Sequence, residues 1–313
     1  MIQGKVLVTG ATGDTGRATV DELLARGHQV RALAHGDDDR SRKLQERGVE
    51  VVYGDLLDFG QVRSALSGVQ RAYFIYPIRP GIVQATAQFA QAAKEAGVDG
   101  IVNMSQVAAR EDAKSHAAFL HWLAERVFDW SGVTVAHIRP TYFAEWLLYV
   151  APMIRKGLLH VPFGTGRHAP ITADDMGRVI VGILEDPASH RGGVYPLFGP
   201  VEYSYQETAQ VLSRVLGKEI EYKQVGFEEF KQTLQAGAQT SAKSQSSRTF
   251  SAKSERTPEQ KAGDDFLFQH LHEVAIDHQN GIFAGTNDLV EKIGGRPPMT
   301  LEAFIEKHRA AFV

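Results

Sequence analysis

The sequence contains no cysteine among its 313 residues. Disulfide bonds, thiolate metal ligands and cysteine nucleophiles are therefore excluded. An excess of positive charge is also missing, because 34 lysines and arginines stand against 37 aspartates and glutamates and give a formal net charge of -3. A row of phosphates needs a basic surface to neutralise it, so we expect no nucleic-acid partner.

Long hydrophobic runs are missing as well. The longest apolar stretch, around residues 146–154, is too short to cross a bilayer and contains Pro152. The first ten residues lead at once into a strand-like run, without the charged and apolar regions of a signal peptide. These features predict a cytoplasmic protein with no membrane partner.

The signatures of two other chemistries are absent. There is no G-x-S-x-G motif of the kind that holds a hydrolase serine. The stretch HLHEVAIDH holds three histidines, but His270 and His272 are two residues apart on an expected helix and do not share a face. We therefore predict no metal site.

What the sequence does contain is an alternation of short β-branched runs with longer amphipathic segments. This spacing favours right-handed crossovers and a parallel sheet with helices on both faces. We predict an α/β fold with a Rossmann-type doubly wound parallel sheet in residues 1–140, onto which residues 173–190 pack back. Residues 141–172 and 191–313 are predicted to form a smaller, mostly helical C-terminal substrate lobe.

Residues 239–263 of this lobe consist mainly of Ser, Lys, Gln and Thr. Such a composition buries too little apolar surface to offset the entropy of ordering the segment. We predict a mobile loop, which is either a plain linker or a flap that closes over a ligand.

The stretch VTGATGDTG follows the first expected strand and opens the first expected helix. Glycines suit a turn where an anion approaches the backbone, and a helix N-terminus offers unpaired N–H groups to it. Gly10 would form the tight turn, Gly13 would admit a pyrophosphate and Gly16 would allow close packing of helix on strand. The predicted binding residues of this turn also include Thr12, Asp14 and Thr15.

The chain resembles the NmrA-like group of atypical short-chain dehydrogenase/reductases, which includes type 2 quinone oxidoreductase and triphenylmethane reductase. The resemblance covers nearly the whole chain and rests on VTGATGDTG, VVYGDLLD, GVTVAHIRPTYFAEWLL and GRPPMTLEAFIEKHRAAF, in this order. It implies a bound NAD or NADP, with Asp55 and Leu56 near the adenine.

The choice between NAD and NADP depends on the end of the second expected strand. An acidic residue there would hold the ribose 2′-hydroxyl, and an arginine would pair with a 2′-phosphate. His35 stands where NADP-dependent relatives have arginine, and the aspartates at 37–39 would repel a phosphate. Arg31, Arg40 and Arg42 could compensate, so the sequence leans slightly towards NADP(H).

Most members of the wider superfamily carry a Tyr-x-x-x-Lys pair on the helix that begins here near Ser115. Counting back from Gly132 places Ala117 at the tyrosine position and His121 at the lysine position. His121 is then a contact to the nicotinamide ribose or the substrate, and a proton donor with a pKa near working pH. The alternative is a histidine satisfied by Glu125, four residues along the same face.

Further candidates follow the carboxyl ends of expected strands, where ligands bind in open α/β sheets. Ser105 is one of them, with a simple strand cap as the alternative. Tyr76 and Pro77 would form one wall of the cofactor cleft, unless they only make a turn. Tyr142 belongs to an aromatic stripe that would be either core or a wall for a flat substrate, and with His121 and Ser105 it completes the predicted catalytic set.

Three functions remain open on the sequence alone, because a fold does not decide function. The first is an NAD(P)H-dependent reductase that passes a hydride to a conjugated acceptor such as a quinone, imine, dye or aromatic natural product. The second is a non-catalytic NAD(P)-binding redox-sensing regulator with a protein partner. The third is a tailoring enzyme of a natural-product pathway with altered chemistry. A homodimer is compatible with all three.

Overall fold

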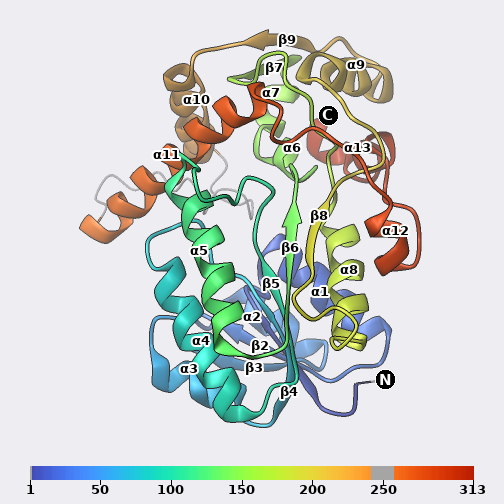
Figure 1. The fold of residues 1–313 in the computed structure, drawn as a ribbon. Coiled ribbons are helices and arrows are strands. Elements are labelled where there is room, and N and C mark those ends of the chain that lie inside the picture. Colours follow the sequence, from blue (N-terminus) through green and yellow to red (C-terminus); the bar gives the residue numbers. More distant parts are fainter. Residues whose placement is uncertain (1, 241–256) are drawn as a thin grey trace.

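The structure is a computed structural model that describes residues 2–240 and 257–313. It contains one large parallel sheet with a second, smaller layer of helices and strands above its carboxyl edge (Figure 1). No helix in the described ranges is both long enough and apolar enough to cross a membrane.

The large sheet has seven parallel strands in the order β3-β2-β1-β4-β5-β6-β8. Its strands are β1 (Lys5–Thr9), β2 (Val30–Ala34), β3 (Glu50–Tyr53), β4 (Val69–Phe74), β5 (Gly100–Met104), β6 (Val135–Pro140) and β8 (Val194–Leu197). The order reverses direction between β1 and β4, and a crevice at such a reversal is where dinucleotides bind in doubly wound folds. The predicted fold class is therefore confirmed.

Helices cover both faces of this sheet, as Figure 1 shows. One face carries α1 (Asp14–Ala25), α2 (Asp39–Glu46), α8 (Ala173–Glu185) and α12 (Leu289–Gly294). The other carries α3 (Phe59–Leu66), α4 (Ile82–Ala96) and α5 (His116–Ser131). Each face has its own buried apolar cluster, which explains why β1 and β5 are apolar without alternation.

One strand of the sheet comes from a part of the chain that the sequence pattern assigns to the lobe. Residues 191–313 are predicted there to form the substrate lobe, yet β8 pairs with β6 through His137↔Val194 to Pro140↔Leu197. The strand has only four residues and is exposed at its start, so it lacks the apolar run of a central strand.

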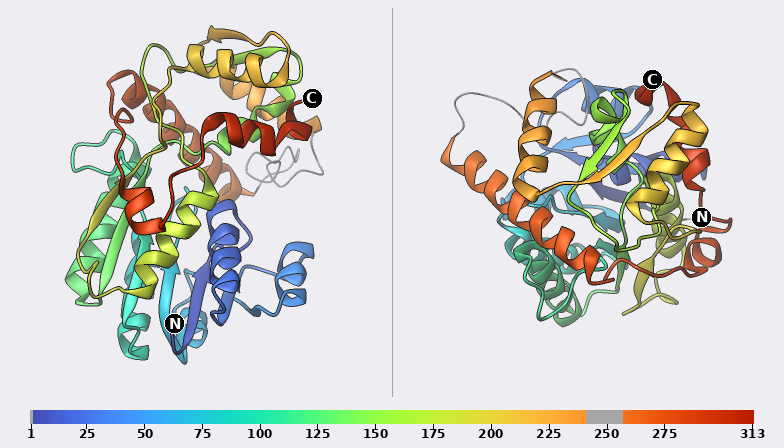
Figure 2. Two further views of the ribbon diagram at one scale, coloured as in Figure 1. Left: turned by 90° about the vertical axis from the view of Figure 1, so that its right-hand side faces the viewer. Right: turned by 90° about the horizontal axis from the view of Figure 1, so that it is seen from above.

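The lobe lies over the carboxyl edge of the sheet and has its own apolar core (Figure 2). It contains a parallel pair of strands, β7 (Leu158–Val161) and β9 (Glu221–Gln224). Its helices are α6 (Trp146–Tyr149), α7 (Ala151–Ile154), α9 (Tyr205–Leu216), α10 (Phe227–Thr240), α11 (Pro258–Gln279), α13 (Leu301–Lys307) and α14 (Arg309–Phe312).

The predicted loop at 239–263 is partly helical. The helix α10 extends to Thr240, and α11 begins at Pro258. Thr257 caps α11 in a capping box with Gln260, and the proline occupies the first turn, where a missing N–H costs nothing. These capping residues outweigh the polar composition of residues 258–263, and residues 241–256 lie outside the described part of the chain.

Candidate functional site

The turn from β1 into α1 has the backbone geometry of an anion-binding loop. Gly10 adopts φ = +58°, a left-handed conformation that favours glycine. A Cβ on Gly16 would overlap the carbonyl of Gly10, so only glycine allows helix and strand to approach this closely. Gly13 is the exposed N-cap of α1 and contributes no side chain, so the first-turn amides are open to an incoming anion.

The side chains around this turn leave its amides accessible. The Thr15 hydroxyl is turned into the sheet, where it lies 2.9 Å from the Tyr73 hydroxyl. Asp14 lines the cavity described below, and Thr12 is half-buried beside Gly13. The geometry of this cradle fits the pyrophosphate of a dinucleotide.

The ends of β2 and β3 lie next to this turn, because β1, β2 and β3 are neighbours in the sheet. His35 follows β2 and is exposed, and Asp55 and Leu56 follow β3 and are half-buried. The Asp55 carboxylate accepts a hydrogen bond from the Leu57 N–H at 2.9 Å, which fixes the turn after β3. The residues that the resemblance assigns to the adenine side thus lie along one sheet edge.

Arg31 was predicted to belong to the cofactor site, and the structure shows that it does not. Its side chain is buried and donates to the carbonyl oxygens of Ala65 and Ser67 at 2.8 and 2.6 Å, and it forms an ion pair with Glu50. The residue is the second of β2, three positions before the strand ends at Ala34, so its guanidinium cannot serve a ligand at the carboxyl edge.

The other two arginines near this edge are engaged with the neighbouring aspartates. Arg40 pairs with Asp38 at 2.8 Å, and Asp38 also caps α2. Arg42 pairs with both Asp37 and Asp39. These pairs are at the protein surface, where ion pairs are weak, so a phosphate could compete for the guanidinium groups.

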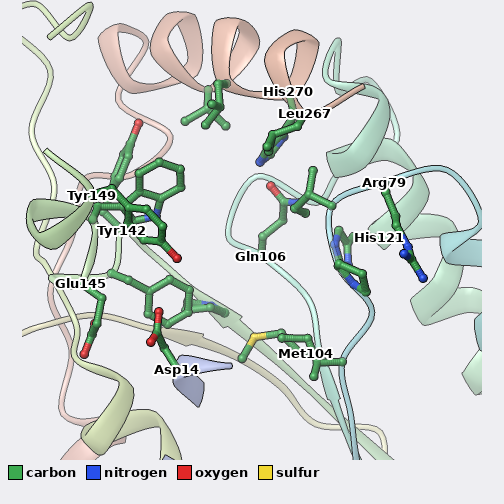
Figure 3. A pocket seen from close by; sticks show the side chains of 18 of the residues that line it. Asp14, Arg79, Met104, Gln106, His121, Tyr142, Glu145, Tyr149, Leu267 and His270 are labelled. Atoms are coloured by element: carbon green, nitrogen blue, oxygen red, sulfur yellow. The ribbon is translucent and has the colours of Figure 1, made fainter. Parts of the chain in front are cut away.

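A cavity of about 770 Å³ extends from the α1 turn along the sheet edge into the lobe. Figure 3 shows Tyr142, Tyr149 and Glu145 on one side, His121 and Arg79 on the opposite side, and His270 and Leu267 reaching in from α11. Much of the lining is aromatic, with Tyr142, Phe143, Trp146, Tyr149, Phe163, Phe230 and Phe283. The cavity suits a flat apolar ligand held by a few polar groups.

Three predicted residues form the sheet-edge wall of the cavity, and they are Tyr76, Pro77 and Ser105. The Tyr76 hydroxyl donates to the Pro80 carbonyl at 3.0 Å and accepts from Arg79, so this wall is held in place. Ser105 is buried, and its hydroxyl has no hydrogen-bond partner among the described residues. A buried hydroxyl that lines a cavity without a partner is a candidate contact to a bound ligand.

Tyr142 lies in the centre of an aromatic cluster and also lines the cavity. Its ring contacts Phe163, Phe283, His168 and His278 at centroid distances of 4.5 to 5.5 Å. Within the described part of the chain its buried hydroxyl has no hydrogen-bond partner. Burial raises the pKa of Tyr142 well above its ordinary value, so the hydroxyl is neutral and suits a hydrogen bond better than proton transfer.

His121 lines the cavity, but its expected acidity is wrong. Burial lowers the pKa of His121 to about 4, so the ring is neutral at working pH. The expected alternative partner is also engaged elsewhere, because Arg139 donates two hydrogen bonds to the Glu125 carboxylate. His121 can therefore offer a neutral ring to a ligand, and it does not act as an imidazolium acid.

Sequence reasoning missed two polar groups of the cavity. The sequence indicates His270 only as a candidate metal ligand, which its spacing from His272 argues against, yet its ring lines the cavity and lies 2.7 Å from the Ser115 hydroxyl. Glu145 accepts from the Ala173 N–H at 2.9 Å, and burial raises the pKa of its carboxyl to about 7. The glutamate of FAEWLL was a visible signal, whereas no local pattern connects His270 with Ser115.

Sequence comparison finds relatives that align with most or nearly all of the chain. The chain is 30% identical to the NAD(P)H azoreductase of Xenophilus azovorans over 310 residues, which cover 98% of this chain and 99% of the relative. It is 32% identical over 237 residues to (4-alkanoyl-5-oxo-2,5-dihydrofuran-3-yl)methyl phosphate reductase of Streptomyces griseus, with 74% and 80% covered. The chain's relatives thus include NAD(P)H oxidoreductases.

Solved structures share the fold. The NADPH complex of the NADPH-dependent quinone oxidoreductase of Escherichia coli superposes with a TM-score of 0.78 at 23% identity, covering 97% of this chain and 99% of that one. The NADP(H) complex of Citrobacter triphenylmethane reductase gives 0.76 at 22% identity, covering 96% and 99%. The profile of the NmrA-like family matches residues 3–277. With the glycine turn and the sheet order in place, this match confirms the resemblance seen in the sequence, and the chain belongs to the NmrA-like family.

Proposed function

We propose that this protein is an NAD(P)H-dependent reductase that passes a hydride to a conjugated acceptor, such as a quinone, imine, dye or aromatic natural product. The observation that carries the proposal is that one continuous cavity joins the α1 turn to the aromatic side chains of the lobe. The azoreductase that aligns over nearly the whole chain supports the same reaction class.

The cofactor supplies the hydride when it is bound, and the protein holds it along the carboxyl edge of the sheet. The open amides in the first turn of α1, next to Gly13, would receive the pyrophosphate, and Asp55 and Leu56 would lie beside the adenine. Tyr76 and Pro77 form the wall that continues towards the lobe. Ser105 and His121 then contact the nicotinamide end or the acceptor, because both line the same cavity.

The lining explains why the acceptor should be conjugated. Reduction of an isolated ketone builds an alkoxide that needs a positioned acid, and such an acid contributes roughly 10²–10⁴-fold in rate. Ala117 occupies the position of the usual tyrosine, and His121 is neutral. A quinone spreads the arriving charge over its ring and takes one proton from water, so holding it in place is sufficient.

The test is a panel of acceptors with each reduced nicotinamide cofactor. We expect oxidation of NADPH or NADH with 1,4-naphthoquinone, a cationic dye or an azo dye, and rates at least about 100-fold lower with cyclohexanone. Efficient cyclohexanone reduction would contradict the proposal, because neither Ala117 nor the neutral His121 supplies the acid that an isolated ketone needs. Tight cofactor binding without transfer to any conjugated acceptor would support the redox-sensing regulator instead.

We further propose NADP(H) as the preferred cofactor, with Arg40 and Arg42 turning from the aspartates to the 2′-phosphate. Arg31 takes no part, because its guanidinium is bound inside the sheet layer. The double variant Arg40→Ala/Arg42→Ala should raise KM for NADPH and leave KM for NADH unchanged. An equal change for both cofactors would contradict this assignment.

A further inference from the structure

A hydrogen bond between α5 and α11 holds one side of the cavity together. The Ser115 hydroxyl oxygen and Nδ1 of His270 are 2.7 Å apart, although the residues are 155 positions apart in the sequence. Ser115 is fully buried and His270 is 9% exposed. Nearby, Gln269 accepts from the His116 N–H and donates to the Lys114 carbonyl, so the two helices are fixed against each other here.

The direction of this hydrogen bond follows from what else the serine does. Ser115 is the N-cap of α5, and its oxygen accepts from the Ala118 N–H at 3.1 Å. Its hydroxyl proton needs an acceptor because the group is buried. Among the described residues that acceptor is Nδ1 of His270. The serine therefore donates, and His270 must carry its own proton on Nε2.

The Nε2–H group then has no partner within the described protein, although the residue lines the cavity. Figure 3 shows the His270 side chain projecting from α11 into the cavity, across from His121 and Gln106. The lining residues of α11 next to His270 are the apolar Leu267, Leu271 and Val274, and its polar lining residues Glu259, Gln260 and Asp264 lie in the first two turns of the helix. A donor in such surroundings contributes strongly to the choice of ligand, because leaving it unpaired is costly.

We propose that His270, oriented by Ser115, is a specificity-determining residue that donates a hydrogen bond from Nε2–H to a carbonyl oxygen of the acceptor. It selects quinone-like acceptors over flat apolar cations that have no such oxygen. This inference rests on the proposed reductase function and names the acceptor class within it.

The histidine suits this role because it stays neutral. Burial lowers the pKa of His270 to about 3, so the ring keeps one proton and one acceptor nitrogen at neutral pH. A neutral N–H donor to a carbonyl stabilises binding modestly, and its loss should weaken binding by roughly five- to tenfold.

Two substitutions separate the donor from the contact with Ser115. His270→Asn places an amide oxygen near the position of Nδ1, so it can accept from Ser115 but does not reach into the cavity. His270→Gln places an amide nitrogen near the position of Nε2, so it keeps a donor in the cavity but loses Ser115. A residue that only supports α5 would tolerate asparagine better, and a residue that selects the acceptor would tolerate glutamine better.

The measurement is equilibrium binding of 1,4-naphthoquinone to the full chain saturated with NADP⁺, followed by tryptophan fluorescence because Trp146 lines the cavity. We expect His270→Asn to weaken naphthoquinone binding about five- to tenfold and His270→Gln to retain most of it. Malachite green should bind His270→Asn at least as tightly as the wild type, because that variant removes the donor that the cation leaves unpaired. Thermal melting of each variant checks that it is folded.

Each outcome of this experiment either supports the inference or overturns it. Wild-type affinity for naphthoquinone in folded His270→Asn, an equal loss for both probes, or no naphthoquinone binding by the wild type would overturn the inference. Because NADP⁺ cannot donate a hydride, the binding test is independent of turnover. Naphthoquinone binding with the expected pattern but no NADPH oxidation by any acceptor would refute the reductase and leave the donor role of His270 standing.

Discussion

The glycine turn and the α11 side of the cavity use different parts of the chain to contact a ligand. At the turn the backbone amides would form the contact, and the glycines allow the left-handed turn at Gly10 and the close approach of helix and strand at Gly16. At α11 the side chain of His270 lines the cavity, and Ser115, on a helix far away in sequence, orients it through a hydrogen bond. The first arrangement can be recognised from spacing along the chain, and the second exists only after the lobe has packed on the sheet.

The two regions also differ in electrostatics. The turn offers N–H groups whose partial charge does not depend on pH. The side chains around the cavity are titratable, and burial keeps His121 and His270 neutral. A change in pH should therefore alter the charge of the cavity side chains. A substitution that adds a side chain should have its main effect at the turn.

The largest expected effect is acid destabilisation through the cavity histidines. The pKa values of His121 and His270 are about 4 and 3 in the folded protein, below the ordinary 6.5, so the unfolded state binds more protons as pH falls below 6.5. Above pH 6.5 both histidines are neutral in the folded and the unfolded state and cost no stability. Between pH 6.5 and its folded pKa, each histidine lowers the free energy of unfolding by about 1.4 kcal/mol per pH unit. Urea unfolding from pH 7 to 4.5 measures this slope, which should fall by about one proton in His270→Asn. An unchanged slope would show that His270 is not the titrating group.

The second effect concerns the turn. Gly13→Val should weaken cofactor binding by at least about 100-fold, or roughly 3 kcal/mol, because the branched side chain occupies the space of the pyrophosphate. The protein should stay folded, because the Cβ would lie 3.3 Å from the Gly10 oxygen, a tight contact that a shift of a few tenths of an ångström relieves. Gly16→Ala is the matched control, because its Cβ overlaps that carbonyl and stability should fall first. Calorimetric titration with NADPH checks both, and unchanged affinity in folded Gly13→Val would refute the placement.

The third effect is a stability gain from Glu145→Gln. Burial raises the pKa of this carboxyl from 4.5 to about 7, so the wild type loses stability as pH rises through that window. Glutamine keeps the acceptor for the Ala173 N–H without the charge. The variant should be more stable than the wild type by about 3 kcal/mol at pH 8 and equal to it near pH 4.5. A pH-independent difference in melting temperature would contradict the titration of Glu145.

The smallest effect is a change in cofactor preference at the end of β2. His35→Arg adds a guanidinium to an exposed position next to the adenine side, and it should lower KM for NADPH by about tenfold without changing KM for NADH. His35→Gln is the control, because it adds no charge. A gain for both cofactors would place position 35 away from the 2′-phosphate.

Much of the sheet half could be predicted from the sequence. The alternation of strands and helices predicts the parallel sheet because both periodicities arise within short segments. The capping signal at Thr172 and the glycine after α9 mark helix ends for the same reason. The strand β8 was missed because its four residues, of which only Leu197 is buried, are too few to show a period. The start of α11 was missed because the polar composition around it hides the capping signal of Thr257 and Pro258.

The residues of the candidate site also differ in whether the sequence could predict them. Tyr76, Ser105, Tyr142 and His121 were found because they follow strand ends or a family position, and all four line the cavity. Arg31 was misplaced because a sequence does not tell which end of a strand a long side chain reaches. The acidity of His121 was misjudged because the pKa depends on burial.

The sequence by itself determined the parallel α/β sheet and the glycine turn, because periodicity and the absence of Cβ atoms act within a few residues. The tertiary structure alone decided which polar groups meet in the cavity. Ser115 and His270 come together only when α11 packs on α5, and that packing also removes the water that would have left the histidines near their ordinary pKa.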